Sequence, residues 1–338
     1  MKTFARVVLQ AVCTAVSVSV LECAAAPVDR ALLIAVGSYE YLRIAPLKGP
    51  RNDVLAMRRA LQHLNVEPSR IVELSDDAPT HRLPSRANIL RALKELQQVA
   101  QRGETVLLYW SGHGAQIPQA LPLKPGAWVE PDGLDEVFIT RDSKLWDNAT
   151  RRVSGALLDD DIGDAVASLA TKGVNVWAIF DTCHAGDMLR SARRVEPGTV
   201  WRGVTLDELG IPPLRQPNPG KRQPRQPPPA KRSFLDDSRI SRDMGAGPGV
   251  GQVIAFYATY PDERAPEMPL PDLNHPSGSP SGAKAYFGLF TWSIATSLMA
   301  SVEPTFRELT TAVKERYASH KTSAPTPMFE GPLDRRLR

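Results

Sequence analysis

Short apolar runs alternate with amphipathic stretches along most of this chain. Continuous apolar runs at 31–36 and 174–180 are typical of strands that are covered on both faces. Between such runs, apolar residues recur at helical spacing. Because strand and helix alternate, the pattern predicts an α/β fold with a mainly parallel sheet between layers of helices. Strands are expected at 31–36, 71–74, 105–110, 136–139, 174–180 and 252–257, and helices around 54–64, 89–100, 162–169, 287–299 and 304–317.

The regular pattern breaks after about residue 190 and returns at residue 252. Residues 215–232 carry six Lys or Arg, six Pro and no acidic residue. Such a stretch buries too little apolar surface to order itself. We therefore expect a large segment at 27–192, a basic Pro-rich linker at 193–250, and a small segment at 251–338 that completes the same sheet.

The formal net charge is +4, and the basic residues of this linker contribute much of it. No aromatic residues interleave with these charges, which argues against nucleic-acid binding. The charge therefore indicates a solvated segment with exposed Arg and Lys side chains.

The first 26 residues have the layout of a secretory signal peptide. Lys2 and Arg6 precede an apolar stretch of about 15 residues, and a membrane-spanning helix needs roughly 20. We expect an exported protein, periplasmic or secreted, without stable membrane insertion; a retained anchor is the alternative. Removal of this segment leaves Cys183 as the one cysteine, so the mature chain has no disulfide framework.

Two expected strands end in residues suited to nucleophilic catalysis. The first leads into Ser111-Gly112-His113-Gly114, and the second into Asp181-Thr182-Cys183-His184-Ala185-Gly186. The carboxyl ends of parallel strands share one edge, where active sites usually lie. A thiol with a pKa of about 8.5 is only slightly ionised at neutral pH, so a nearby imidazole would supply the thiolate. A buried, inert cysteine beside an unrelated histidine is the alternative.

These motifs, with Asp132-Gly133-Leu134-Asp135-Glu136 between them, resemble those of metacaspases and their bacterial caspase-like relatives. The resemblance extends to residues 47–53, 287–291 and 326–331. It implies a three-layer α/β/α sandwich around a mainly parallel, six-stranded, caspase-like sheet. It also implies a cysteine-type endopeptidase, commonly monomeric, whose chemistry requires no cofactor.

By this resemblance, His113 and Cys183 are the catalytic dyad. The imidazole would take the proton of the thiol and return it to the leaving amine. The backbone N–H groups of Gly114 and Cys183 would form the oxyanion hole.

The resemblance also implies a substrate pocket lined by Asp53, Ser111 and Asp181. Asp262 adds to its negative field, or lies in a solvated turn. A carboxylate about 4 Å from a substrate cation contributes about 4 kcal/mol at an effective dielectric of about 20, before desolvation is subtracted. Peptide or protein substrates cut after Arg or Lys are therefore expected.

Calcium binding is an open expectation. Asp142, Asp159 and Asp160 match the metacaspase calcium site, and carboxylate oxygens suit this cation. The family's fourth aspartate is replaced by Arg190. An acidic helix N-terminus explains the run at 159–161 equally well.

A protease with this preference would find cleavable bonds in its own linker, so we expect self-cleavage between Arg190 and Arg232. Two other functions remain open at this point. One is a legumain-like or gingipain-like peptidase with a different pocket preference. The other is a catalytically silent caspase-like module that only binds.

Overall fold

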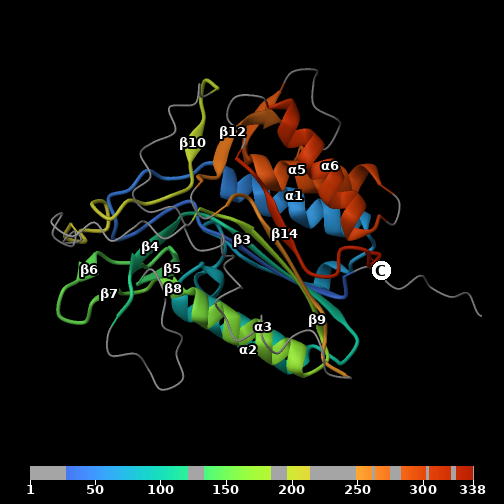
Figure 1. Cartoon of the computed structure of the whole chain (residues 1–338), viewed down its shortest axis with the longest axis horizontal. Helices are drawn as coiled ribbons and strands as arrows, with labels where there is room; N and C mark the ends of the chain where they lie inside the picture. Colours follow the sequence, from blue (N-terminus) through green and yellow to red (C-terminus); the bar gives the residue numbers. More distant parts are fainter. Residues whose placement is uncertain are drawn as a thin grey trace, which may run out of the picture.

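The structure, a computed structural model, is built around one six-stranded sheet (Figure 1). It describes residues 28–120, 133–183, 196–213, 249–260, 263–274, 283–301, 304–320 and 325–337. The strand order is β14-β11-β9-β3-β1-β2. These strands are β1 (Arg30–Ala35), β2 (Ile71–Leu74), β3 (Thr105–Ser111), β9 (Asn175–Asp181), β11 (Val253–Tyr257) and β14 (Met328–Glu330). All neighbours are parallel except β11 and β14, which are antiparallel.

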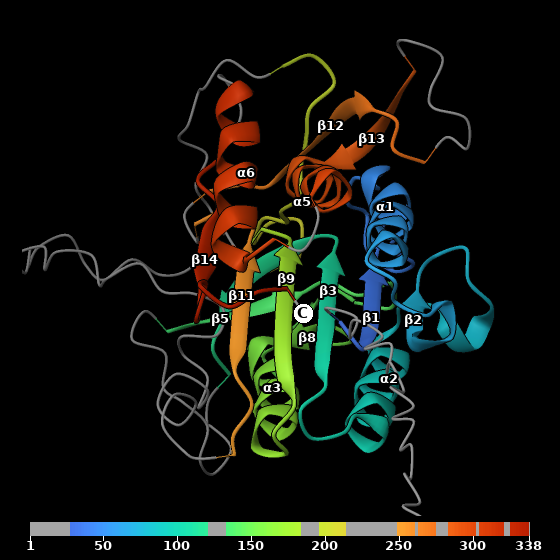
Figure 2. The same ribbon diagram turned by 90° about the vertical axis from the view of Figure 1, so that its right-hand side faces the viewer.

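Helices cover both faces of this sheet, as Figures 1 and 2 show. One face packs against α1 (Gly49–His63), α5 (Leu289–Ala300) and α6 (Phe306–Ser319), and the other against α2 (Arg86–Val99) and α3 (Asp159–Thr171). Two short 3-10 helices, η1 (Pro68–Arg70) and η2 (Thr80–Arg82), flank β2. The predicted three-layer α/β/α sandwich with a mainly parallel six-stranded sheet is therefore confirmed.

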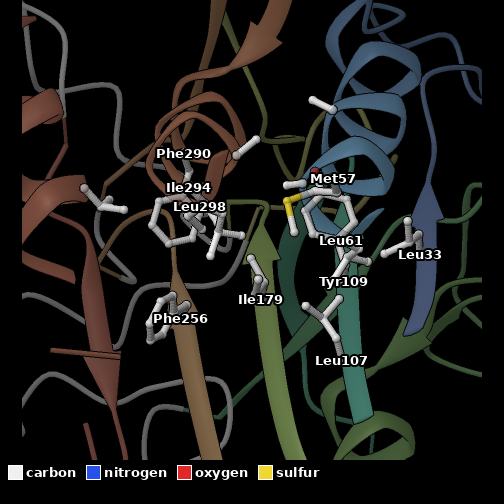
Figure 3. Packing of buried hydrophobic residues seen from close by; sticks show 14 of the residues in the cluster. Leu33, Met57, Leu61, Leu107, Tyr109, Ile179, Phe256, Phe290, Ile294 and Leu298 are labelled. Atoms are coloured by element: carbon white, nitrogen blue, oxygen red, sulfur yellow. The ribbon is translucent and has the colours of Figure 1, made fainter. Parts of the chain in front are cut away.

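Side-chain alternation along the strands divides the core into two layers. In β3, Leu107 and Tyr109 face the α1 and α5 side, whereas Leu108 and Trp110 face the α2 and α3 side. Figure 3 shows the first layer, where Tyr109 lies beside Met57 of α1 and Leu107 lies further along β3. Because both faces of β3 are buried, this strand is held rigidly up to its carboxyl end.

Smaller sheets lie around the central one. One has the order β10 (Val200–Trp201), β12 (Pro266–Pro271), β13 (Lys284–Gly288), and another the order β4 (Gly114–Pro118), β5 (Leu134–Phe138), β8 (Leu157–Leu158). A two-stranded ribbon joins β6 (Trp146–Asp147) and β7 (Arg152–Val153). In Figure 2, the arrowheads of β1, β3, β9 and β11 point toward β12 and β13. The small sheet with β10 therefore lies at the carboxyl edge of the central sheet.

Among the differences from the sequence-based expectation, three concern the central sheet, β12 and the linker. The strand expected at 136–139 is β5, which pairs with β4 outside the central sheet, and the sixth central strand is β14. β12 was not expected, because Pro266, Pro269 and Pro271 interrupt its pattern. Finally, residues 196–213 of the expected linker are described and carry β10.

The expected signal peptide and residues 193–195 and 214–248 of the expected linker lie outside the described residues. Residues 251–338 contribute β11 and β14 to the same sheet as the strands of the large segment. No helix in the described part of the chain is long and apolar enough to cross a membrane.

Candidate active site

His113 and Cys183 follow neighbouring strands of the central sheet. Ser111, at the end of β3, lies opposite Asp181, at the end of β9. His113 and Cys183 each come two residues later, and both side chains are buried. Neighbouring strands lie about 4.8 Å apart. The register therefore brings the two residues to the same level of one sheet edge.

The loop after β1 holds His113 in place. Its backbone N–H donates a hydrogen bond of 2.9 Å to the Tyr39 hydroxyl, and the two ring centroids are 5.2 Å apart. The Tyr39 hydroxyl in turn donates to the carbonyl oxygen of Val36 at 3.0 Å. Burial raises the pKa of Tyr39, so this side chain keeps the proton that it donates.

The His113 ring is oriented by a backbone carbonyl. Its Nε2 lies 2.9 Å from the carbonyl oxygen of Ala45. A carbonyl only accepts, so Nε2 carries the proton and Nδ1 keeps the lone pair. Within the described residues Nδ1 has no hydrogen-bond partner. Burial lowers the pKa of His113 to about 4, so the ring is neutral at pH 7 and Nδ1 is unprotonated.

The thiol of Cys183 contacts the segment between β11 and β12. Its Sγ donates a hydrogen bond of 3.1 Å to the carbonyl oxygen of Glu263. The thiol is the donor in this contact, because a backbone carbonyl oxygen only accepts. The Glu263 carboxylate accepts a 2.7 Å hydrogen bond from the backbone N–H of Thr326. It therefore anchors the chain before β14.

Three residues predicted to line a substrate pocket meet around one arginine. The hydroxyl of Ser111 donates to Oδ2 of Asp53 at 2.9 Å. Arg202 places Nη2 at 2.5 Å from the same oxygen and Nη1 at 3.1 Å from Oδ1 of Asp181. Nη1 also donates to Ser111 Oγ at 3.1 Å and to the backbone carbonyl of Asp181 at 3.0 Å. The guanidinium of Arg202 is fully buried at this point.

A third carboxylate completes the surroundings of Arg202. Oε2 of Glu267, in β12, lies 3.5 Å from Nη2 of Arg202. Its oxygens also accept hydrogen bonds from the backbone N–H groups of Lys48 (2.9 Å) and Gly49 (3.0 Å), at the start of α1. An acidic group is favoured there, because it neutralises the positive end of the helix dipole.

Two glycines make room for the guanidinium. A Cβ on Gly49 would lie 2.5 Å from Nη2 of Arg202, and one on Gly288 would lie 2.6 Å from Nη1 and 2.1 Å from Oδ2 of Asp181. The backbone N–H of Gly288 donates to Oδ1 of Asp53 at 3.0 Å. The space around the Arg202 guanidinium is therefore bounded by the backbone of these glycines as well as by the carboxylates.

The electrostatics of the pocket depend on its cation. Burial raises the pKa of Asp53 to about 7, although the charge of Arg202 works in the opposite direction. Burial alone would lower the pKa of Arg202, but Asp181, Asp53 and Glu267 outweigh it and raise that pKa well above its usual value. Arg202 thus stays charged, and the carboxylates need a cation in this position.

Gly114, the predicted oxyanion donor, begins β4. It forms a parallel bridge with Gly203, and its carbonyl accepts a 3.1 Å hydrogen bond from the N–H of Val204. The residue that follows Arg202 therefore lies directly beside Gly114. Asp262 and Arg190, which also entered the predictions, lie outside the described residues.

The residues predicted to bind calcium do not form a cation site in the described part of the chain. No group of three His, Cys, Asp or Glu side chains there is placed to hold a metal ion. Oδ1 of Asp142 accepts from the Arg86 backbone N–H at 2.8 Å and from the Thr140 hydroxyl at 2.7 Å. Asp159 and Asp160 lie in the first turn of α3. These residues therefore fit the acidic helix start better than a calcium site.

Comparison with known proteins agrees with this geometry. Residues 29–192, which include both motifs, match the family described as "Metacaspase, peptidase C14 domain". This segment is a metacaspase-like domain. Similar curated proteins are Metacaspase-1 of Lodderomyces elongisporus, 32% identical over 162 residues, and Metacaspase-1A of Neurospora crassa, 36% identical over 163 residues.

The two alignments each cover 47% of this chain, and 33% and 32% of the relatives. The chain thus matches about a third of the length of these curated proteins. A crystal structure of a protein from Geobacter sulfurreducens covers 90% of this chain and 93% of its own, with a TM-score of 0.55 and 16% identity. The fold of the metacaspase-like domain, together with the segment after it, is therefore shared with that protein.

Four residues of the site were missed by sequence analysis: Tyr39, Ala45, Arg202 and Glu267. The carbonyl of Ala45 acts through the backbone, so its residue type carries no signal. Arg202 did have a sequence signal, because it lies between apolar residues in Val200-Trp201-Arg202-Gly203-Val204, unlike the polar, proline-rich sequence at 215–232. Such a pattern favours a short buried strand over a solvated linker.

Proposed function

We propose that this chain is a cysteine endopeptidase that cuts peptide bonds after Arg or Lys. One observation carries the proposal: a buried pocket of three carboxylates encloses a guanidinium at the same sheet edge as His113 and Cys183. An imidazole that is neutral at pH 7 and a cysteine at matching register are the two groups that such a reaction needs.

In the proposed reaction, Nδ1 of His113 takes the proton of the Cys183 thiol, and the sulfur attacks the carbonyl carbon of the substrate. The negative charge that develops on the carbonyl oxygen is stabilised by the N–H groups of Gly114 and Cys183. The C–N bond then breaks, and His113 gives its proton to the leaving amine. Water hydrolyses the resulting thioester and restores the thiol.

The specificity follows from the pocket. A substrate guanidinium or ammonium would occupy the position of the Arg202 side chain, between Asp53, Asp181 and Glu267. An Asp side chain would add a further negative charge to a desolvated, acidic site, which is strongly unfavourable. A neutral Asn side chain would leave the carboxylates without a cation.

The test is hydrolysis of reporter peptides that end in Arg, Lys, Asn or Asp, by the wild type and by Cys183→Ala. We expect kcat/KM for Arg and Lys to exceed that for Asp by at least about 100-fold, equivalent to about 2.7 kcal/mol. Cys183→Ala should lose at least about 1,000-fold of the activity while its circular dichroism stays unchanged. Preference for Asn would indicate the legumain-like alternative. Absence of any hydrolysis would indicate a module that only binds.

We also propose that the enzyme acts as a monomer on exported or periplasmic protein substrates, and that residues 1–26 direct its export. Calcium enters no step of this mechanism, because the described residues do not fit a site for it. Gel filtration tests the monomeric state, and mass spectrometry of the mature N-terminus tests the removal of residues 1–26.

A further inference from the structure

The segment around Arg202 is bound in the manner of a peptide substrate. β10 pairs antiparallel with β12, with Val200 opposite Glu267 and Trp201 opposite Pro266. The backbone N–H of Arg202 donates a 2.8 Å hydrogen bond to the carbonyl of Ala265. Addition of an extended segment to a sheet edge, with a side chain seated in a pocket, is a common mode of peptide recognition.

The backbone after Arg202 is placed for cleavage. Gly203 forms the parallel bridge with Gly114, and the N–H of Val204 donates to the carbonyl of Gly114. In a parallel bridge of this pattern, the N–H of Gly114 faces the carbonyl of Arg202. That N–H is the predicted oxyanion donor. The carbonyl of the 202–203 bond is therefore directed at the group that would stabilise its negative charge.

The thiol lies next to the same short stretch of backbone. Cys183 donates to the carbonyl of Glu263, and Arg202 donates to the carbonyl of Ala265, two residues further on. The side chain of Arg202 also contacts the carbonyl of Asp181, two residues before Cys183. Side chain and backbone of Arg202 thus both occupy positions that a substrate residue before the cut bond would need.

We propose that residues 200–204 are a built-in substrate strand and that Arg202–Gly203 is the bond that the enzyme cuts in itself. While this strand is intact, it keeps other Arg and Lys side chains out of the pocket. The inference rests on the proposed function and adds the position of self-cleavage and its regulatory consequence.

The chemical step is the one described above, within one chain. The Cys183 sulfur bonds to the carbonyl carbon of Arg202, and its proton passes to His113. The bond between this carbon and the nitrogen of Gly203 breaks, and His113 protonates the new amine. Water then hydrolyses the thioester, so the products are a carboxylate on Arg202, an amino terminus on Gly203 and the restored thiol.

The experiment uses the full chain as wild type, Cys183→Ala, Arg202→Lys, Arg202→Gln and Gly203→Pro. Intact-mass spectrometry and N-terminal sequencing locate any cut, and an Arg reporter peptide measures activity. The wild type and Arg202→Lys should yield a fragment that begins at Gly203. Cys183→Ala, Arg202→Gln and Gly203→Pro should keep this bond intact.

Gly203→Pro is the most informative variant, because it retains Arg202 in the pocket while it removes the cleavable secondary amide. It should hydrolyse the Arg reporter at least tenfold more slowly than cut wild type. Arg202→Gln leaves three buried carboxylates without a cation and can unfold. The inference is therefore tested by Arg202→Lys and Gly203→Pro.

Two results would overturn the inference and leave the proposed function standing. One is a wild type that hydrolyses the Arg reporter while its 202–203 bond stays intact. The other is Gly203→Pro with the reporter activity of cut wild type. Either would show that Arg202 is a permanent structural ion-pair partner. If no form hydrolyses the reporter, the proposed function fails together with the inference.

Discussion

This molecule has two groups of three acidic residues, and the two groups differ in their ability to surround a cation. In the pocket, Asp53, Asp181 and Glu267 come from distant parts of the chain and converge on one buried guanidinium. At the start of α3, three aspartates are consecutive in sequence at 159–161, and within the described residues they are not part of a group that could hold a metal ion. Within the described residues, proximity in sequence therefore did not produce a metal site, whereas convergence in space produced a site for the Arg202 guanidinium.

Geometry explains the difference. Successive residues of a helix point about 100° apart, so consecutive aspartates are distributed around the first turn of α3. There Asp161 accepts from the backbone N–H of Leu158 and pairs with Arg86 at 2.6 Å, which stabilises the helix start. At the edge of a parallel sheet, by contrast, strand ends and helix starts from separate segments face one centre.

The largest expected effect comes from removal of one pocket carboxylate. Asp181→Asn keeps an oxygen that can accept from the N–H and hydroxyl of Thr291, but it loses the charge that faces Arg202 and, in the proposed mechanism, the substrate cation. Loss of one partner of a buried charge pair costs about 2–4 kcal/mol. We therefore expect kcat/KM for an Arg reporter to fall by about 30- to 1,000-fold.

The matched control is Asp160→Asn, which removes an exposed carboxylate from the other acidic group. It should change kcat/KM by less than about twofold, because exposed charges contribute little. Equal losses in the two variants would contradict the distinction between the two groups. Thermal denaturation of both proteins separates a loss of function from a loss of fold.

A second prediction concerns the pH dependence of stability. Burial raises the pKa of Asp53 to about 7, whereas its unfolded value is about 4. The folded state then binds more protons than the unfolded state between these values, so this group makes stability fall as pH rises from about 4 to about 7. Asp53→Asn removes this contribution. His113, whose pKa is lowered to about 4, works in the opposite direction in both proteins.

Urea denaturation of wild type and Asp53→Asn at pH 5 and at pH 7 isolates the contribution of Asp53. The free energy of unfolding of the wild type should fall relative to the variant by about 1–2 kcal/mol over this range. Parallel changes in the two proteins would show that Asp53 titrates as it does in the unfolded chain.

Sequence patterns predicted the fold well because they report burial. Strands such as β3 and β9 are apolar on both faces, and the amphipathic helices present one apolar side, so periodicity alone identifies the layers. Ser111, Asp181 and Asp53 were assigned to a pocket through the resemblance to metacaspases. The structure places all three around one guanidinium.

The rest of the site could not be predicted, because it depends on contacts between distant segments. Glu267 reaches the pocket from β12, a strand hidden by prolines, and Ala45 contributes only a carbonyl. Arg202 lies in the range 193–250 that was predicted to be a linker; its apolar neighbours favour a short strand but do not indicate the carboxylates that it meets. Backbone pairing from β12 and Gly114 orders this segment, together with the charges of Asp53, Asp181 and Glu267. Local sequence does not encode these contacts.

The smallest expected effect concerns calcium and Asp142. An Asn side chain at this position can still accept the hydrogen bonds from the Arg86 N–H and the Thr140 hydroxyl through Oδ1. Asp142→Asn should therefore keep activity on the Arg reporter within about twofold of wild type, both in a chelator and in about 1 mM calcium. Stimulation of the wild type by calcium that disappears in Asp142→Asn would contradict this. The acidic start of α3 would then be a cation site completed by segments outside the described residues. The two acidic groups would then differ only in the cation that they bind, calcium in one and a guanidinium in the other.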